Sequence, residues 1–130
     1  MTRLAAVLAA LLLLAGAAPA SAVGPWHHGI STFYSWQQYG CGRFGSWRIS
    51  CARRGGLACK GTYGRMTLGV AHLSLPCGAL VQLRYAGRTI TVPVIDRGPY
   101  TRGLDFDLTT ATCEAIRHCL TGPLDWRLAP

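Results

Sequence analysis

Two alternating apolar runs, joined by a two-residue turn, constrain the fold of this chain more than any other feature. The runs are Ala79 to Tyr85 and Arg88 to Ile95, and in each an apolar residue returns at every second position, as in a half-buried β-strand. Ala86-Gly87 between them is a tight-turn signal, so we predict a β-hairpin. Pro93 cannot donate a ladder hydrogen bond, and we therefore expect an edge, a bulge or a strand crossing there.

Strand signals also flank the hairpin on both sides. Gly29 to Ser35 is dominated by β-branched and aromatic residues, which favour strands. Thr67 to Ala71 is strand-like, and Leu124 to Leu128 alternates as a closing strand. The sequence shows no internal repeat and no second domain, so we expect a single all-β domain.

Helical spacing occurs once, from Leu108 to His118. Asp107 or Thr109 can cap the N-terminus of this helix, because each side chain carries an oxygen that accepts a backbone N–H bond. Cys113 and Cys119 are separated by about 9 Å along a regular helix, which exceeds the roughly 7 Å limit for a disulfide. Unless the helix ends early, each of the two is expected to pair with the irregular segment upstream.

The first 22 residues have the pattern of a secretory signal peptide. Arg3 supplies a positive charge, Leu4 to Ala15 is almost entirely apolar, and Ala20-Ser21-Ala22 matches an A-x-A cleavage site. No Cys stands near this site, so we expect a secreted or cell-envelope protein without a stable membrane anchor. The mature domain would span residues 23–130 and act as a monomer.

Six cysteines, all in the predicted mature part, indicate a disulfide framework. Six cysteines allow about 15 connectivities, and the sequence does not choose among them. A Cys59–Cys77 pair, if formed, would contribute roughly 3 kcal/mol in the chain-entropy model. Gly40 to Gly64 shows no periodicity and is interpreted as an irregular segment held by disulfides. Zinc-like cysteine spacing does not occur, and we expect neither a metal nor a cofactor.

The chain is basic, with 13 Lys and Arg against five Asp and Glu and a formal net charge of +8. Outside the cytosol nucleic acid is not an expected partner, whereas anionic cell-wall polymers are plentiful. A soluble basic surface without a specific partner explains the charge equally well.

Aromatic residues crowd the stretch from Val23 to Trp47. Most of these rings should fill the core of so small a domain, but Tyr34 and Trp36 are candidates to line a sugar-binding groove. Asp96 follows the second run of the hairpin and precedes Arg97-Gly98-Pro99, which gives its carboxylate a fixed position with access to solvent. An Asp in such a turn also commonly serves only to accept backbone N–H bonds.

The run from Leu68 to Leu108 resembles the rare lipoprotein A (RlpA)-like double-psi β-barrel family. The motifs that carry the resemblance are Gly69-Val70-Ala71-His72, Leu75-Pro76-Cys77-Gly78, Val94-Ile95-Asp96-Arg97-Gly98-Pro99-Tyr100 and Asp107-Leu108-Thr109. The resemblance implies a six-stranded double-psi β-barrel with one short helix, related to the expansin and barwin barrels. It also implies peptidoglycan glycan strands as the binding partner.

By the same resemblance, Asp96 and His72 correspond to the acid and the histidine that line the groove of the family's lytic transglycosylases. The candidate substrate-binding residues are Tyr34, Trp36, Arg97, Tyr100 and Asp105. The catalytic enzymes of the family also carry a Glu shortly before the Ala-His pair, where this chain reads Lys60 to Arg65 without an acid.

Hydrolysis of a glycosidic bond ordinarily uses two carboxylates, but lytic transglycosylation needs only one. The 6-hydroxyl of muramic acid attacks the anomeric carbon, and Asp96 would act as general acid and then general base. The leading hypothesis is therefore a peptidoglycan lytic transglycosylase in which Asp96 and His72 meet on one wall of a groove. The alternatives are a non-catalytic, expansin-like wall-binding or wall-loosening module and a barwin-like secreted domain that recognises a protein.

Overall fold

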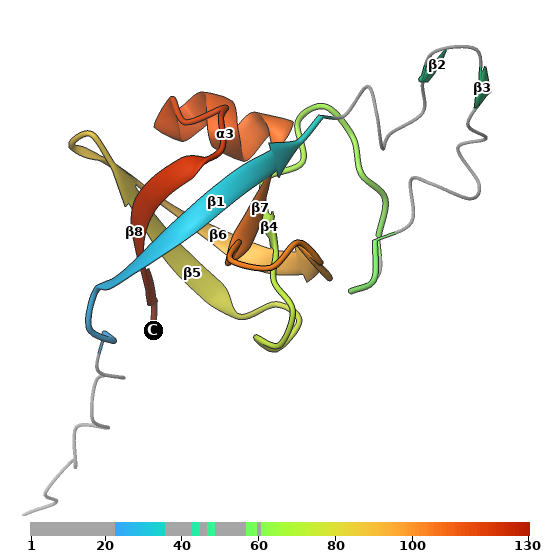
Figure 1. Cartoon of the computed structure of the whole chain (residues 1–130). Coiled ribbons are helices and arrows are strands. Elements are labelled where there is room, and N and C mark those ends of the chain that lie inside the picture. The colour runs from blue at the N-terminus through green and yellow to red at the C-terminus, as the bar shows by residue number, and fades with distance from the viewer. Residues whose placement is uncertain (1–22, 36–42, 45–46, 49–56, 60) are drawn as a thin grey trace, which may run out of the picture.

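The computed structural model describes residues 23–35, 43–44, 47–48, 57–59 and 61–130. Six strands close into a barrel in the spatial order β1-β7-β4-β6-β5-β8, with one short helix, α3, packed against it (Figure 1). The elements of the barrel are β1 (His27–Tyr34), β4 (Val70–Ala71), β5 (Leu80–Tyr85), β6 (Arg88–Asp96), β7 (Phe106–Thr109), α3 (Thr110–Ile116) and β8 (Gly122–Leu128). Two further strands, β2 (Arg43–Phe44) and β3 (Trp47–Arg48), pair with each other as an antiparallel ribbon. The expected six-stranded barrel with one short helix is confirmed.

The predicted hairpin is formed by β5 and β6, which pair antiparallel from Leu80 opposite Pro93 to Tyr85 opposite Arg88. Ala86 and Gly87 both have positive φ, 45° and 77°, as a type I′ turn requires. The turn therefore matches the right-handed twist of the two strands it joins.

The core lies inside the barrel and is made by the inward positions of its strands. The fully buried apolar residues are Val70, Val81, Leu83, Val92, Val94, Phe106 and Leu108. Ile116 and Cys113 of α3 join this cluster from outside the sheet. Alternation predicted the inward faces of β5 and β6 correctly, because one face of each strand is buried and the other is solvated.

An irregular register interrupts the pairing of β4 with β6. Val70 pairs with Val94, but the next residue, Ala71, pairs with Asp96, so Ile95 is an extra residue in β6. This is the local effect of a β-bulge, and it lies two residues beyond Pro93. β4 itself is shorter than the predicted Thr67–Ala71 strand, since only Val70–Ala71 pairs.

The predicted helix starts too early, because Phe106–Thr109 is a strand that pairs with β1 and β4. α3 begins after Thr109, whose side chain accepts the N–H of Thr112 at 3.3 Å. Thr109 is thus the N-cap, and Asp107 is not. Arg117 then ends the helix in the left-handed conformation, with φ 57° and ψ 44°.

This early end changes one disulfide prediction. Cys113 and Cys119 pair with each other at a Cα–Cα distance of 4.8 Å, because the chain turns back after Ile116 instead of continuing as a helix. The expected pairing with the upstream segment, which was conditional on a helix that does not end early, is therefore not formed. The conditional Cys59–Cys77 pair is formed, with Cα atoms 5.4 Å apart, and no described cysteine is free.

Several predictions fall outside the described residues. These are the signal peptide at 1–22, Trp36, Cys41, Cys51 and most of the 40–64 segment. Within the part of the chain that the structure describes, no helix is long and apolar enough to cross a membrane.

Candidate functional site

A pocket of about 550 Å³ lies on the outer surface of the barrel, beside the junction of β1, β4, β6 and β7. Ala71 and Asp107 reach it from β4 and β7, and each alternates along its strand with buried core residues. Because successive side chains of a strand point to opposite faces, this alternation places the pocket outside the barrel. The loop at 97–104 forms a further wall.

Two carboxyl groups, those of Asp96 and Asp107, line this pocket on either side of Ala71. Ala71 of β4 pairs with Asp96 of β6 on one side and with Asp107 of β7 on the other. Two strand spacings of about 4.8 Å put the two aspartate Cα atoms about 10 Å apart. The side chain of Ala71, which lies between them in the sheet, is a single methyl group, and all three residues line the pocket.

The β-bulge explains how Asp96 comes to face the pocket. Strict alternation along β6 would give Asp96 the same inward direction as Val92 and Val94, which are fully buried. The extra residue, Ile95, shifts the register by one. Asp96 consequently shares the outer face of Ala71, which agrees with the use of bulges to redirect side chains near functional sites.

Asp96 is held at one oxygen and open at the other. Its Oδ1 accepts the backbone N–H groups of Ala58 and Arg97, both at 2.9 Å. Oδ2 accepts no hydrogen bond from any described residue. The turn role considered from the sequence is thus present, and the position of Asp96 in the pocket lining is compatible with the predicted site role.

Asp107 lacks such partners. Its Oδ1 is buried and has no hydrogen-bond partner among the described residues. Burial, and then the negative charge of Asp96, raise the pKa of Asp107 from 3.8 to about 6. Asp107 can therefore carry a proton at mildly acidic pH.

Sequence reasoning missed Asp107 as a site residue because helical spacing was extended back to Leu108 and made Asp107 a cap. A signal was present in the alternation of Asp105, Phe106, Asp107 and Leu108, which is a strand period.

Two buried tyrosines lie beside the carboxyl pair. Tyr63 donates its hydroxyl proton to the carbonyl oxygen of Tyr34 at 2.6 Å and accepts the backbone N–H of Thr110 at 2.8 Å. Burial raises the pKa of both phenols, and the charge of Asp96 adds to the effect on Tyr34. Both rings therefore stay neutral. Tyr34 lines the pocket, as expected from the sequence, whereas Tyr63 was not among the predicted residues.

Aromatic rings also border the open side of the pocket. Phe33 is 37% exposed and Tyr100 is 81% exposed, and both contribute to the lining. Flat apolar rings at the edge of a polar pocket can pack against the faces of sugar rings. Tyr100 is therefore in the pocket lining, and its part in substrate binding stays a prediction.

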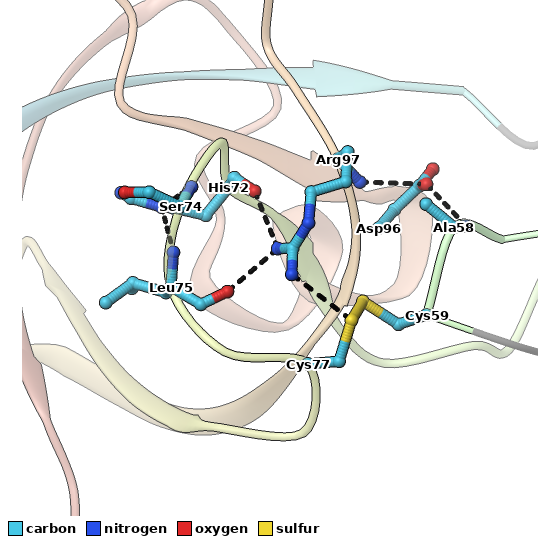
Figure 2. Close-up of a disulfide and its surroundings, with 8 residues drawn as sticks. All are labelled: Ala58, Cys59, His72, Ser74, Leu75, Cys77, Asp96 and Arg97. Atoms are coloured by element: carbon cyan, nitrogen blue, oxygen red, sulfur yellow. Dashed lines mark hydrogen bonds between the residues drawn. A yellow bond between two sulfur atoms is a disulfide. The ribbon is translucent and has the colours of Figure 1, made fainter.

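Arg97 lies beside Asp96, but its guanidinium group binds the protein (Figure 2). One terminal nitrogen donates to the carbonyl oxygens of His72 at 3.0 Å and Leu75 at 2.8 Å. The other donates to Sγ of Cys77 at 3.3 Å. These contacts occupy the group that was expected to bind substrate.

His72 does not line the pocket with Asp96. Since Ala71 faces the pocket, the next residue points to the opposite face of the strand. The imidazole packs on Phe106, with ring centroids 4.9 Å apart, and Nδ1 accepts the N–H groups of Ser74 and Leu75. Burial lowers the pKa of His72. Figure 2 shows the Arg97 side chain between the imidazole and the Asp96 carboxylate, so the expected meeting of these two groups on one wall is not found.

Asp105 is also outside the pocket lining. Its Oδ2 accepts the N–H of Ile30 at 2.8 Å, and its own N–H donates to the carbonyl of Ile30 at 2.8 Å. Among the described residues no group of three His, Cys, Asp or Glu is arranged to hold a metal ion.

The barrel resembles two solved structures. One is the Streptomyces papain inhibitor, with a TM-score of 0.54 and 21% identity over 83% of this chain and 97% of that protein. The other is an expansin variant from Clavibacter michiganensis in complex with cellohexaose, with a TM-score of 0.52 and 19% identity over 82% of this chain and 51% of that protein. At these identities the likeness shows the fold, a double-psi β-barrel.

Sequence comparison is more specific. A probable endolytic peptidoglycan transglycosylase RlpA from Aquifex aeolicus is 42% identical over 48 residues, which is 35% of this chain and 21% of that protein. The match therefore spans about a fifth of this relative. Residues 28–123 match the family described as "Lytic transglycolase". The chain therefore belongs to the RlpA-like lytic transglycolase family of double-psi β-barrels.

Proposed function

We propose that this protein is an exported lytic transglycosylase that cleaves peptidoglycan glycan strands, with Asp107 as the general acid and Asp96 as its charged partner. The single observation that carries the proposal is the carboxyl pair on either side of Ala71, in a pocket bordered by Phe33 and Tyr100. Family membership supplies the reaction class, and two disulfides fit an oxidising compartment outside the cytoplasm.

The reaction needs one proton transfer in each direction. Protonated Asp107 gives its proton to the glycosidic oxygen as the bond to the anomeric carbon breaks. The 6-hydroxyl of the muramic acid then attacks that carbon, and its proton returns to Asp107, which restores the acid. The Asp96 carboxylate stabilises the positive charge that develops on the sugar ring.

This assignment differs from the one based on sequence, in which Asp96 was the acid. It rests on the rule that titratable neighbours in unlike environments take opposite roles. Asp96 accepts two backbone N–H bonds, whereas the buried oxygen of Asp107 has none from the described residues. The carboxyl with the raised pKa is the better proton donor at neutral pH.

The test is the formation of 1,6-anhydromuramyl ends from glycan strands freed of stem peptides. Wild type should form them, and Asp107→Asn should reduce the rate by about 10²–10⁴, the usual contribution of a general acid. Asp96→Asn should also be strongly impaired. Asp125→Asn is the matched control, because Asp125 pairs with Arg84 and His28 away from the pocket lining. The rate should fall as the pH rises above about 6, the pKa of Asp107.

The second candidate is a non-catalytic, expansin-like module that binds the wall through the same pocket. The observation that favours it is the absence of any acid from Lys60 to Arg65. If wild type and Asp107→Asn both sediment with cell wall and neither forms anhydro products, this alternative is established and the transglycosylase proposal is rejected.

A protein partner is the third candidate, and the fold of the Streptomyces papain inhibitor is compatible with it. Inhibition of papain together with failure to sediment with cell wall at physiological salt would favour this reading.

The net positive charge of the chain, in contrast, favours contact with anionic wall polymers.

A further inference from the structure

The Cys59–Cys77 disulfide is linked to the Asp96 carboxylate through Ala58, the residue before Cys59, and through Arg97 (Figure 2). The short segment before it runs along the end of β6. There the N–H of Ala58 donates to Oδ1 of Asp96 at 2.9 Å, and the N–H of Cys59 donates to the carbonyl of Ile95 at 3.2 Å. One of the two N–H groups that hold Asp96 is therefore carried by a neighbour of a disulfide cysteine.

Arg97 ties the other half of the disulfide to the same carboxylate. Its guanidinium binds the carbonyl oxygens of His72 and Leu75 and Sγ of Cys77, while its backbone N–H binds Oδ1 of Asp96. The contacts close a circuit from Asp96 through Arg97, Cys77, Cys59 and Ala58 back to Asp96. Only Ala58 and Arg97 bind Asp96 directly, and the disulfide connects them; we call these four residues the Asp96 clasp.

We propose that the Asp96 clasp positions the Asp96 carboxylate for the reaction and that reduction of its disulfide opens the site without unfolding the barrel. Arg97 is then a positioning residue, which accounts for a guanidinium turned toward protein carbonyls. The catalytic part of this inference rests on the proposed function. The structural part, that the disulfide delivers the Ala58 N–H to Asp96, does not.

The redox step is an ordinary thiol–disulfide exchange. A dithiol reductant supplies two electrons and two protons, the Cys59–Cys77 bond becomes two thiols, and the reductant becomes a disulfide. Cys77 is exposed, so an external dithiol can reach the bond. The guanidinium 3.3 Å from Sγ of Cys77 favours the thiolate there.

The second disulfide provides a matched control. Cys113–Cys119 closes a short loop at the end of α3, and neither cysteine lines the pocket. Its removal should weaken the fold but leave the Asp96 contacts in place.

The experiment follows backbone amide resonances of ¹⁵N-labelled protein from pH 3 to 7. In wild type, the amides of Ala58 and Arg97 should shift in one shared transition, because both donate to the same carboxylate oxygen. Cys59→Ser/Cys77→Ser should lose the transition at Ala58, keep it at Arg97, and leave the β5 and β8 amides in place. Cys113→Ser/Cys119→Ser should keep both transitions. Cys113→Ser/Cys119→Ser treated with dithiothreitol should also lose the transition at Ala58 and keep it at Arg97.

Two outcomes would overturn the inference. In one, Ala58 still follows the carboxylate after the Cys59–Cys77 bond is gone. In the other, the β5 and β8 resonances disappear together with that of Ala58 in Cys59→Ser/Cys77→Ser, which would make this disulfide a global staple. If wild type forms anhydro products, Cys59→Ser/Cys77→Ser should form them at least 10-fold more slowly, and Cys113→Ser/Cys119→Ser within about 2-fold of wild type. Absence of products from wild type refutes the proposed function, and the amide readout still decides the clasp.

Discussion

Asp107→Asn should make the folded protein more stable at neutral pH, although it removes the proposed acid. The pKa of Asp107 is raised from 3.8 to about 6 in the folded state. Between these values the folded chain binds a proton that the unfolded chain has released. Stability therefore falls as the pH rises from about 4 to 6 and stays lower above that range.

The magnitude follows from the width of this window. At about 1.36 kcal/mol per pH unit, the interval from 3.8 to about 6 sets a ceiling of about 3 kcal/mol. Asp107 is only partly buried, and solvent in the pocket screens its charge, so we expect about 1–2 kcal/mol. For a domain of this size, that corresponds to an increase in Tm of about 5–10 °C.

The assay is urea denaturation of wild type and Asp107→Asn at pH 4, 5, 6 and 7. The difference in unfolding free energy should be near zero at pH 4, grow up to pH 6 and then level off. Taking the difference cancels the contribution of His72, whose lowered pKa acts in the opposite direction in both proteins. In an Asp96→Asn background, Asp107→Asn should increase the unfolding free energy by a smaller amount. The reason is that the charge of Asp96 is the second cause of the raised pKa of Asp107. A variant that is less stable than wild type at pH 7 would refute the reasoning, since it would mean that Asp107 makes a stabilising contact.

Two further substitutions test the packing and the charges around the barrel. Gly69→Ala should destabilise by about 1–3 kcal/mol, because an added Cβ would lie 2.5 Å from Cδ1 of Ile95; a change below about 0.5 kcal/mol in urea denaturation would contradict this. Asp125→Asn should destabilise above pH 4, since hydrogen bonds from Arg84 and His28 lower the pKa of Asp125. This contribution is present above the ordinary pKa of the carboxyl and is lost as the pH falls through the lowered one, so equal stability of variant and wild type at pH 7 would exclude it.

Alternation of apolar and polar residues predicted the strands that bury one face in the core and expose the other. β5 and β6 alternate because one face packs in the core, and that period is visible in the sequence. β7 was missed because Leu108 fits both the strand that ends at Thr109 and the helix that follows. The position of the N-cap decides between them, and by residue type Asp107 is at least as good a cap as Thr109. Only the pairing of β7 with β1 and β4, which depends on distant residues, resolves the boundary.

The candidate site was half predictable for a related reason. Asp96 was identified from its turn and from the resemblance. The face to which its side chain points, however, depends on the bulge at Ile95, and no residue type in the sequence indicates that bulge. His72 was placed with Asp96 because both belong to motifs of the family. Because successive side chains of β4 point to opposite faces, Ala71 lines the pocket and His72 packs against Phe106 on the other face.

The contrast between two aspartates supports the proposed role of the pocket. Asp125 is tied to Arg84 and His28 on the barrel surface, as a structural carboxylate should be. Asp107 buries an oxygen that has no partner among the described residues and lies near another negative charge. The helix does not need it, because Thr109 is the cap. A buried acid oxygen without a partner among the described residues, in a position that the helix does not need, supports the proposal that Asp107 serves a ligand.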